Sequence, residues 1–243
     1  MAWPSTSQPA DKPALPAGQR IYAVGDIHGR ADLLRRLLKL IEADAAERGP
    51  AEVRVMFLGD YIDRGPDSPE VLDILSGLPL VPYRVTCLRG NHEEALLAFI
   101  DDPVRCRFWL DWGGMETMRA YGVTEGRDLH DMADQLNDVL PGRHRAFLLS
   151  LPISETVGDY LFVHAGVDPH KPLDEQEDLD LNTIREPFLG WGKWLGKMVV
   201  HGHTISPVPE MLSWRIGIDT GAYASGRLTA LGLEGTRRWI VST

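Results

Sequence analysis

The chain has 243 residues, of which 44% are hydrophobic and 25% are charged. These values are typical of a globular protein and exclude a collagenous, low-complexity or wholly disordered chain. The formal net charge of −10 predicts repulsion from nucleic acid and from anionic membrane surfaces, so we expect neither as a partner.

Residues 1–20 are rich in proline and contain no apolar run of signal-peptide length, so we expect a flexible tail without an export signal. No apolar run reaches the roughly 18 residues that a membrane-spanning helix needs. The two cysteines, Cys87 and Cys106, are not spaced as metal ligands, and a reducing compartment is the default for them. These features together predict a cytoplasmic protein.

The first predicted unit is a strand, a helix and a second strand. Residues 21–24 are an apolar run that ends at Gly25, and leucines and isoleucine then recur at helical spacing up to Ile41. The helix should end near Gly49, and residues 53–58 are typical of a mostly buried strand.

The same theme repeats with a helix that begins at Ser68 and a strand over residues 83–88. Because the carboxyl ends of parallel strands meet at one edge of a sheet, where ligands bind, we expect Asp26, Asp60 and Asn91 to lie close together.

The rest of the chain changes character twice. Residues 93–149 are helical and aromatic, with a break at Gly113-Gly114, and predict a helical cap. Six short apolar segments with glycine-rich turns then predict a second sheet: residues 153–157, 160–163, 198–200, 214–218, 228–233 and 239–241. The acidic stretch 174–180 is expected to be a solvated loop. Without a repeat or a clear linker, residues 21–243 are predicted to form a single α/β domain.

Five short polar motifs each follow an apolar run: GDIHG at 25–29, GDYIDRG at 59–65, GNHE at 90–93, HAG at 164–166 and HGHT at 201–204. Any one of them could be an ordinary turn or helix cap. Their joint occurrence at the ends of successive strands instead favours a site, because capping does not require aspartate, asparagine and histidine together.

These motifs mix oxygen donors with imidazoles, which suits Mn²⁺, Fe or Zn²⁺ better than Ca²⁺ or Mg²⁺. There are too many donors for one ion, so two divalent metals are implied. Two ions about 3.5–4 Å apart need a shared carboxylate, and Asp60 is the best candidate for that bridge.

The five motifs, in this order and at these intervals, resemble those of the calcineurin-like metallophosphoesterases. The likeness runs from about residue 21 to residue 233 and is greatest to the bacterial serine/threonine phosphatases of the phosphoprotein phosphatase branch. It implies a two-sheet β-sandwich flanked by helices, an αββα arrangement, with the helical cap as an insertion.

The resemblance also implies roles for individual residues. Asp26 and His28 would bind the first metal, with Asp60 as the bridge. The ligands of the second metal would be Asn91, His164 and His203. His92, paired with Asp63, would protonate the leaving alkoxide, and Arg64 would hold phosphate oxygens.

Three further assignments have alternatives. Arg185 is expected to be a second phosphate-binding arginine, although Thr183 replaces the family's tryptophan, and it could instead be a surface residue that pairs with Glu186. His201 could contact a metal or could only fix its loop. Tyr223 could lie over the site or only pack.

The resemblance implies a two-metal phosphomonoesterase, in which a hydroxide that bridges two Mn²⁺ ions attacks phosphorus in line. A serine/threonine protein phosphatase acting on a phosphoprotein or phosphopeptide is the first interpretation. A hydrolase of dinucleoside polyphosphates or other nucleotides is the alternative, and a stacking aromatic from Trp109, Trp112 or Tyr223 would favour it. A third possibility is an inert metal-binding regulator, but His92, Asp63 and Arg64 are all present.

Overall fold

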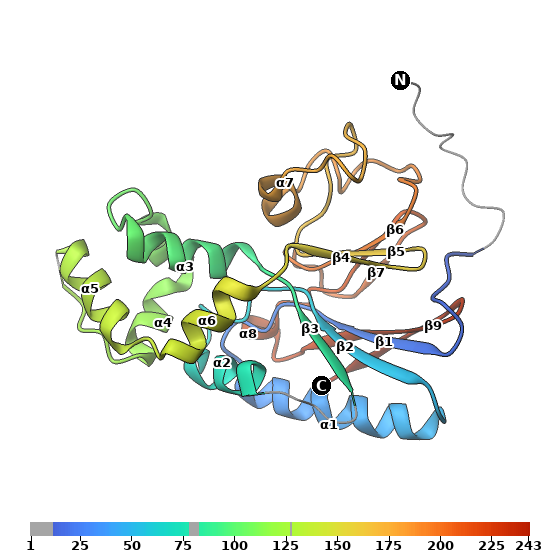
Figure 1. Ribbon diagram of the computed structural model, residues 1–243, viewed down its shortest axis with the longest axis horizontal. Coiled ribbons are helices and arrows are strands. Elements are labelled where there is room, and N and C mark those ends of the chain that lie inside the picture. The colour runs from blue at the N-terminus through green and yellow to red at the C-terminus, as the bar shows by residue number, and fades with distance from the viewer. Residues whose placement is uncertain (1–11, 78–82, 127) are drawn as a thin grey trace.

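The computed structural model describes residues 12–77, 83–126 and 128–243, and its core is a pair of β-sheets packed face to face (Figure 1). The first sheet has the strand order β10 (Arg237–Ser242), β9 (Thr229–Glu234), β1 (Gln19–Val24), β2 (Glu52–Phe57), β3 (Arg84–Cys87). The second has the order β4 (Ser154–Val157), β5 (Tyr160–Val163), β6 (Met198–His201), β8 (Arg215–Gly217), β7 (Glu210–Met211).

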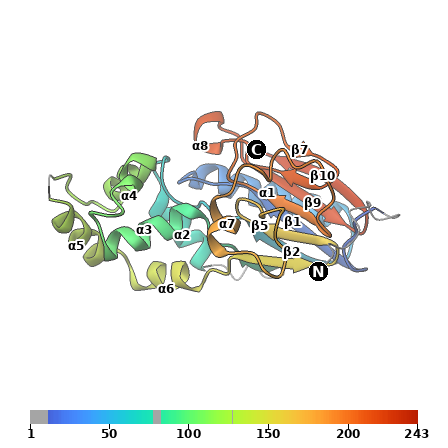
Figure 2. The same cartoon turned by 90° about the horizontal axis from the view of Figure 1, so that it is seen from above.

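Helices cover the outer faces of this sandwich and extend to one side of it (Figures 1 and 2). The long helix α1 (Ala31–Glu47) and α2 (Ser68–Gly77) cover the first sheet. The cap consists of α3 (Asn91–Asp101), the kinked segment η1 (Leu110–Gly114), α4 (Met115–Ala120), α5 (Leu129–Val139) and α6 (Gly142–Ser150). The short helices α7 (Asp178–Thr183) and α8 (Ala222–Ser225) follow later in the chain.

Strand alternation explains how the two sheets face each other. Ile21 and Ala23 of β1 belong to the core between the sheets, together with Tyr160 and Phe162 of β5. Tyr22 and Val24 of β1 point to the opposite face, into the core beneath α1 and α2. Successive strand side chains point to opposite faces, so β1 is buried on both faces and its residues 21–24 form a continuous apolar run.

The parallel pairing of β1 with β2 and of β2 with β3 brings their carboxyl ends to one edge of the first sheet. This confirms the predicted convergence of the three polar loops that follow these strands. The helices predicted after residue 30 and from Ser68 are also present, as α1 and α2.

Two predictions about the last third of the chain are wrong. The segments 228–233 and 239–241 were expected in the second sheet, but β9 pairs antiparallel with β1, and β10 pairs with β9. Periodicity indicates which faces of a strand are buried, not which strand is its partner. The acidic stretch was expected to be a loop, but α7 begins within it at Asp178.

The segment predicted as a tail is described only from residue 12 onward. Within that part, Leu15 is buried in the core between the sheets, and its backbone N–H donates to the carbonyl of Gly235. Residues 12–18 therefore pack against the sandwich before β1 begins at Gln19.

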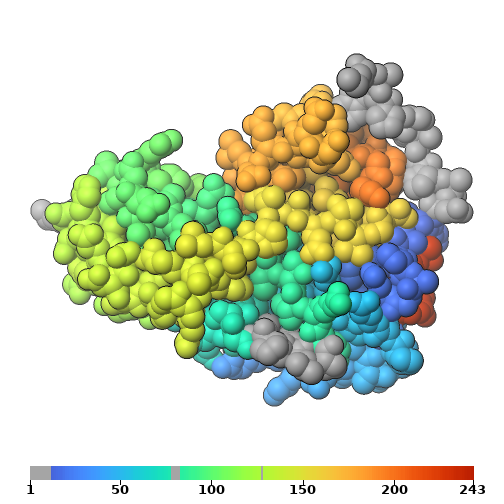
Figure 3. Space-filling view, viewed as in Figure 1, coloured from blue at the N-terminus to red at the C-terminus, as the bar shows by residue number. Residues whose placement is uncertain are grey.

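The cap is continuous with the sandwich. Phe99, Trp109 and Leu136 of the cap belong to the same buried cluster as α1 and the first sheet. The space-filling view shows a notch between the cap and the orange segment around residues 165–195 (Figure 3). Within the described ranges, no helix is long and apolar enough to cross a membrane.

Candidate active site

Unusual backbone conformations gather in loops that follow β1 and β2 of the first sheet and β6 of the second. Within the described ranges, the non-glycine residues with positive φ are His28, Asp60, Asp63, Arg64 and His203, all of which the sequence analysis had singled out. Such conformations cost on the order of 1–3 kcal/mol each and persist only where the surrounding structure enforces them. The fold thus holds these five residues in strained geometry at one place.

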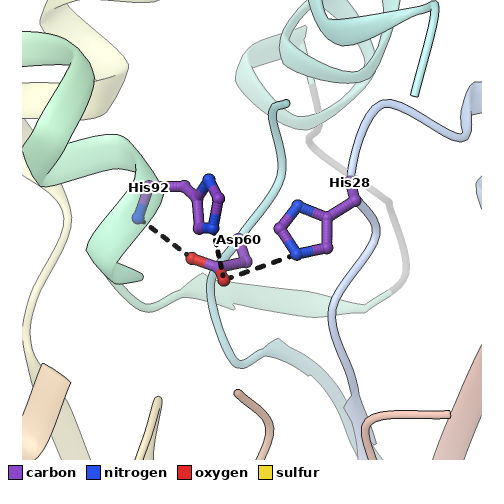
Figure 4. Close-up of side chains that lie close together, drawn as sticks. All are labelled: His28, Asp60 and His92. Carbon is purple, nitrogen blue, oxygen red and sulfur yellow. Dashed lines mark hydrogen bonds and ion pairs between the residues drawn. The ribbon is translucent and has the colours of Figure 1, made fainter. Parts of the chain in front are cut away.

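Asp60 lies at the centre of the site, in the loop after β2. Its Oδ2 is 3.6 Å from Nε2 of His28 and 3.8 Å from Nε2 of His92 (Figure 4). Its Oδ1 is 3.4 Å from Nε2 of His164. Each carboxylate oxygen therefore faces imidazoles from different loops, and the buried Asp60 is common to two groups of possible metal ligands.

The first group is His28, Asp60 and His92, and the second is Asp60, His164 and His203. In each group, one ligand atom per residue lies within 4.8 Å of the others. Asn91, the first residue of α3, extends the second group because its Oδ1 lies 3.0 Å from Nε2 of His164.

Backbone carbonyls fix the orientation of two of these imidazoles. Nδ1 of His28 donates to the carbonyl of Ile62 at 2.8 Å, and Nδ1 of His164 pairs with the carbonyl of Leu58 at 2.9 Å. The Nε2 atoms of both rings are therefore directed at Asp60. Metal-binding histidines are commonly oriented by such a hydrogen bond from the other ring nitrogen.

Among the described residues, two imidazole nitrogens are buried without a hydrogen-bond partner: Nε2 of His28 and Nε2 of His203. Burial lowers the pKa of both imidazoles to about 3, so both are neutral at physiological pH. A buried, neutral and unpaired imidazole nitrogen is what a divalent metal requires of a histidine ligand. The residues present therefore fit a pair of divalent cations.

Asp26 lies beside the second group, at the end of β1. Its carboxylate accepts the backbone N–H of His203 at 3.0 and 3.1 Å. A Cβ at Gly202 would lie 2.1 Å from Oδ1 of Asp26, so only glycine permits this approach. Burial and the nearby negative charge of Asp219 raise the pKa of Asp26. Asp219 has no role in the sequence analysis, which considered its loop only for Tyr223.

His92 and Asp63 form a buried pair. Nδ1 of His92 lies 2.6 Å from Oδ2 of Asp63, which also accepts Nε1–H of Trp109 at 2.7 Å. The hydroxyl of Thr117 donates to the other carboxylate oxygen at 2.6 Å. Burial opposes protonation of His92, but the carboxylates of Asp60 and Asp63 outweigh it and raise the pKa of the imidazole.

Arg64 lies at the open side of this pair. One of its terminal nitrogens is 3.2 Å from Nε2 of His92, and its Nε donates to the carbonyl of Trp112 at 3.3 Å. The guanidinium also lies 4.9 Å from the ring centroid of Tyr223. Cap and sandwich thus meet at this arginine.

Glu93 is a residue that the sequence analysis quoted but gave no role. Its carboxylate accepts the backbone N–H groups of Asp60, Tyr61 and Gly90 at 2.8 to 2.9 Å. Burial raises its pKa to about 7. Glu93 therefore ties the loop after β2 to the start of α3, and its capping-box position three residues after Gly90 is the signal that could have found it.

Arg185 lies at the periphery of the site. It is exposed and lies just after α7. The pKa of His203 is lowered mainly by burial and by the charge of His164, and the guanidinium of Arg185 lowers it further. Among the described residues it forms no ion pair with Glu186. The structure therefore brings Arg185 near the second group without a direct contact.

His201 lies outside both groups. Its Nδ1 pairs with the carbonyl of Gly202 at 3.0 Å, and its Nε2 is 3.3 Å from a guanidinium nitrogen of Arg215. Its ring also packs against Phe188. Of the two alternatives for His201, this geometry supports loop fixing.

The three aromatic candidates also separate. Trp109 is fully buried and contacts Asp63, whereas Trp112 is 41% exposed and Tyr223 is 36% exposed. The ring of Tyr223 packs edge to face with His28, and that of Trp112 lies beside His92. Tyr223 therefore borders the site.

Comparison with known proteins agrees with this geometry. The calcineurin-like phosphoesterase family matches residues 19–226. A symmetrical bis(5'-nucleosyl)-tetraphosphatase of Methylococcus capsulatus is 37% identical over 61% of this chain and 44% of its own length, so the chain spans less than half of that relative. One from Legionella pneumophila (strain Corby) is 40% identical over 90% of this chain and 96% of its own length.

A crystal structure of a candidate diadenosine tetraphosphatase superposes with a TM-score of 0.64 at 21% identity, covering 94% of this chain and 98% of that one. At this identity the likeness concerns the fold. The structural likeness supports the two-sheet fold, and the family model matches most of the sequence. The chain belongs to the calcineurin-like phosphoesterase family.

Proposed function

We propose that this protein is a divalent-metal-dependent phosphohydrolase that cleaves dinucleoside tetraphosphates symmetrically into two nucleoside diphosphates. Three relatives that match 90% of this chain and 96% of their own length carry the name symmetrical bis(5'-nucleosyl)-tetraphosphatase. These names favour the nucleotide alternative over the serine/threonine protein phosphatase that the sequence analysis placed first.

The observation that carries the metal dependence is the shared position of Asp60 between two buried imidazole groups. By the resemblance of the motifs, Asp26 would join His28 and Asp60 in holding one cation, whereas the group that the geometry gives around His28 contains His92. The second cation would be held by Asp60, Asn91, His164 and His203. The mixture of imidazole and carboxylate ligands suits Mn²⁺, with Fe and Zn²⁺ as alternatives.

When bound, the two cations would supply Lewis-acid chemistry that neutralises phosphate charge and activates water. Arg64 would bind oxygens of the polyphosphate chain through its guanidinium, which is suited to two parallel hydrogen bonds. Arg185, on the side of His203, would contribute positive charge at the other end of the site.

His92 is the candidate proton donor to a leaving oxygen of alkoxide type; the nucleoside diphosphate released from a tetraphosphate is a better leaving group and depends on this proton less. The buried carboxylate of Asp63 holds the ring of His92 by the Nδ1 contact at 2.6 Å, which leaves Nε2 on the side of Asp60 and Arg64. Asp63 is itself held by Trp109 and Thr117, so the orientation of the His92 ring is fixed.

The test is turnover of diadenosine tetraphosphate, a phosphoserine peptide and p-nitrophenyl phosphate by the purified protein supplied with Mn²⁺. We expect the largest kcat/KM on diadenosine tetraphosphate, with ADP as the only nucleotide product, and loss of activity after chelation. The Asp60→Asn variant is the inactive control. A larger kcat/KM on the peptide would overturn the proposal in favour of a protein phosphatase.

A further inference from the structure

Exposed aromatic side chains lie on both sides of Arg64. On the cap side, Trp112 is 41% exposed and Phe108 is 42% exposed, with their ring centroids 4.7 Å apart. On the sandwich side, Tyr223 in α8 is 36% exposed. These two surfaces come from segments that are more than 100 residues apart in the chain.

Both surfaces adjoin the residues of the site. The Trp112 ring centroid is 5.8 Å from that of His92, and the Tyr223 ring centroid is 5.5 Å from that of His28. Arg64 connects them, because it donates to the carbonyl of Trp112 and its guanidinium lies over the ring of Tyr223. A ligand bound at Arg64 would therefore have an aromatic surface on each side.

The position of Trp112 is fixed by its backbone. Gly113 has a φ of +109°, and a Cβ there would lie 2.6 Å from Cγ of Arg64. The next residue, Gly114, lies directly against the ring of Trp109. The kink at Gly113 holds Trp112 at the edge of the site while Trp109, three residues earlier, is buried against Asp63.

Tyr223 is also held in place from outside its own helix. The carbonyl of its neighbour Ala222 accepts a hydrogen bond from Arg30 at 3.0 Å, and Ala222 itself is buried. Exposed aromatic rings on a fixed backbone provide stacking surface at little cost in conformational entropy.

We propose that these aromatic surfaces are two nucleobase platforms, one formed by Trp112 with Phe108 and the other by Tyr223. This inference rests on the proposed function and deepens it. Each platform stacks one base of a dinucleoside polyphosphate, and the phosphate chain runs between them past Arg64. With one base on each side, the middle of a tetraphosphate chain lies over Asp60, which accounts for symmetric cleavage.

The experiment compares ligands that carry zero, one or two bases. The variants are Trp112→Leu, Tyr223→Leu and their combination, and the matched controls Trp112→Phe and Tyr223→Phe retain an aromatic face. For each protein, the readouts are the KM for diadenosine tetraphosphate and the inhibition constants of ADP and pyrophosphate against p-nitrophenyl phosphate hydrolysis.

Base–aromatic stacking is worth about 1–3 kcal/mol per base, so each leucine variant should raise the KM for diadenosine tetraphosphate by about tenfold or more, and the combination by about a hundredfold. The ratio of the ADP and pyrophosphate inhibition constants should rise in at least one leucine variant, because only ADP carries a base. The phenylalanine variants should stay close to the wild type in both readouts.

Two results would overturn the inference: leucine variants that bind ADP as well as the wild type does, or variants that weaken ADP and pyrophosphate equally. The second result would mean that the rings only position Arg64 and His28. The inhibition constants do not require diadenosine tetraphosphate to be a substrate, so failure of the platforms is separable from failure of the proposed function, which wild-type turnover decides.

Discussion

At the scale of single residues, Asp60 has the most connections in the site. Its side chain faces His28 and His92 through one oxygen and His164 through the other, and its backbone N–H donates to Glu93. A Cβ at position 90 would lie 2.2 Å from Oδ1 of Asp60, so only a glycine at this position allows the backbone to come this close to Asp60. Asp60 is thus fixed by contacts from several separate loops.

The sharing of Asp60 predicts how metal content responds to substitution. Asp60→Asn should weaken both metal sites, because an amide has lost the negative charge that both cations share. Asn91→Ala should weaken mainly the site near His164, to which Asn91 is adjacent. Metal counting by atomic emission on purified variants checks this, and full occupancy of both sites in Asp60→Asn would refute the shared role.

His92 predicts a dependence on the leaving group. His92→Asn removes the proton donor, so hydrolysis of an alkyl phosphate should slow by roughly 10²–10⁴-fold, a typical contribution of general acid catalysis. Hydrolysis of p-nitrophenyl phosphate should slow much less, because that leaving group needs no proton. Steady-state kinetics on both substrates provide the check, and equal losses would rule out His92 as the acid.

At the scale of elements, the turn η1 determines how the cap meets the sandwich. Its residue Gly113 accepts the backbone N–H of Arg64 through its carbonyl at 3.1 Å, and a Cβ on it would also lie 2.8 Å from N of Arg64. The turn thus sets both the position of Arg64 and the exposure of Trp112.

This contact predicts different effects at two glycines that both have positive φ. Gly113→Ala should be more destabilising than Gly122→Ala, since nothing lies within 4 Å of a Cβ at Gly122. The left-handed conformation alone costs an alanine about 1–2 kcal/mol in either place. Gly113→Ala should also raise the KM for the phosphate substrate, whereas Gly122→Ala should not. Urea unfolding and kinetics measure both effects, and equal behaviour would contradict the role of η1.

At the scale of the whole molecule, the loops of the site are anchored by three buried clusters. One lies between the first sheet and the helices, one between the sheets, and one on the outer face of the second sheet beneath α7. The metal-binding groups lie where loops from both sheets and α3 meet. The imidazoles and carboxylates at that junction are buried and make few hydrogen bonds, which costs free energy. Bound cations would offset this cost.

Metal binding should therefore stabilise the folded protein as a whole. Ligands that bind only the folded state add about 4 kcal/mol when present at a thousand times their dissociation constant. We expect the Tm to fall after exhaustive chelation and to recover with added Mn²⁺, together with activity. Thermal scans of the Asp60→Asn variant are the control, and they should respond much less to Mn²⁺. An unchanged wild-type Tm would argue against resident metals.

Most of the site could be predicted from the sequence because its residues follow strands directly. The residues Asp26, Asp60 and Asn91 each come within a few positions of a strand end, and parallel pairing brings strand ends together. Arg185 was less certain because it follows α7 in a segment without regular structure, and His201 because it ends β6, where the sequence does not show which side chains face it. Glu93, Asp219 and Thr117 received no role, since their contacts reach across the fold.

The sequence by itself determined the order of helices and strands from β1 to β3, the convergence of polar loops at one sheet edge and the family motifs, because these depend on local periodicity and on residues close in the chain. Only the tertiary structure decided that β9 and β10 join β1, that His201 faces Arg215, and that Trp112 and Tyr223 flank Arg64. Strand pairing and side-chain contacts depend on packing between segments that are distant in the chain, and local sequence patterns do not show which segments pack together.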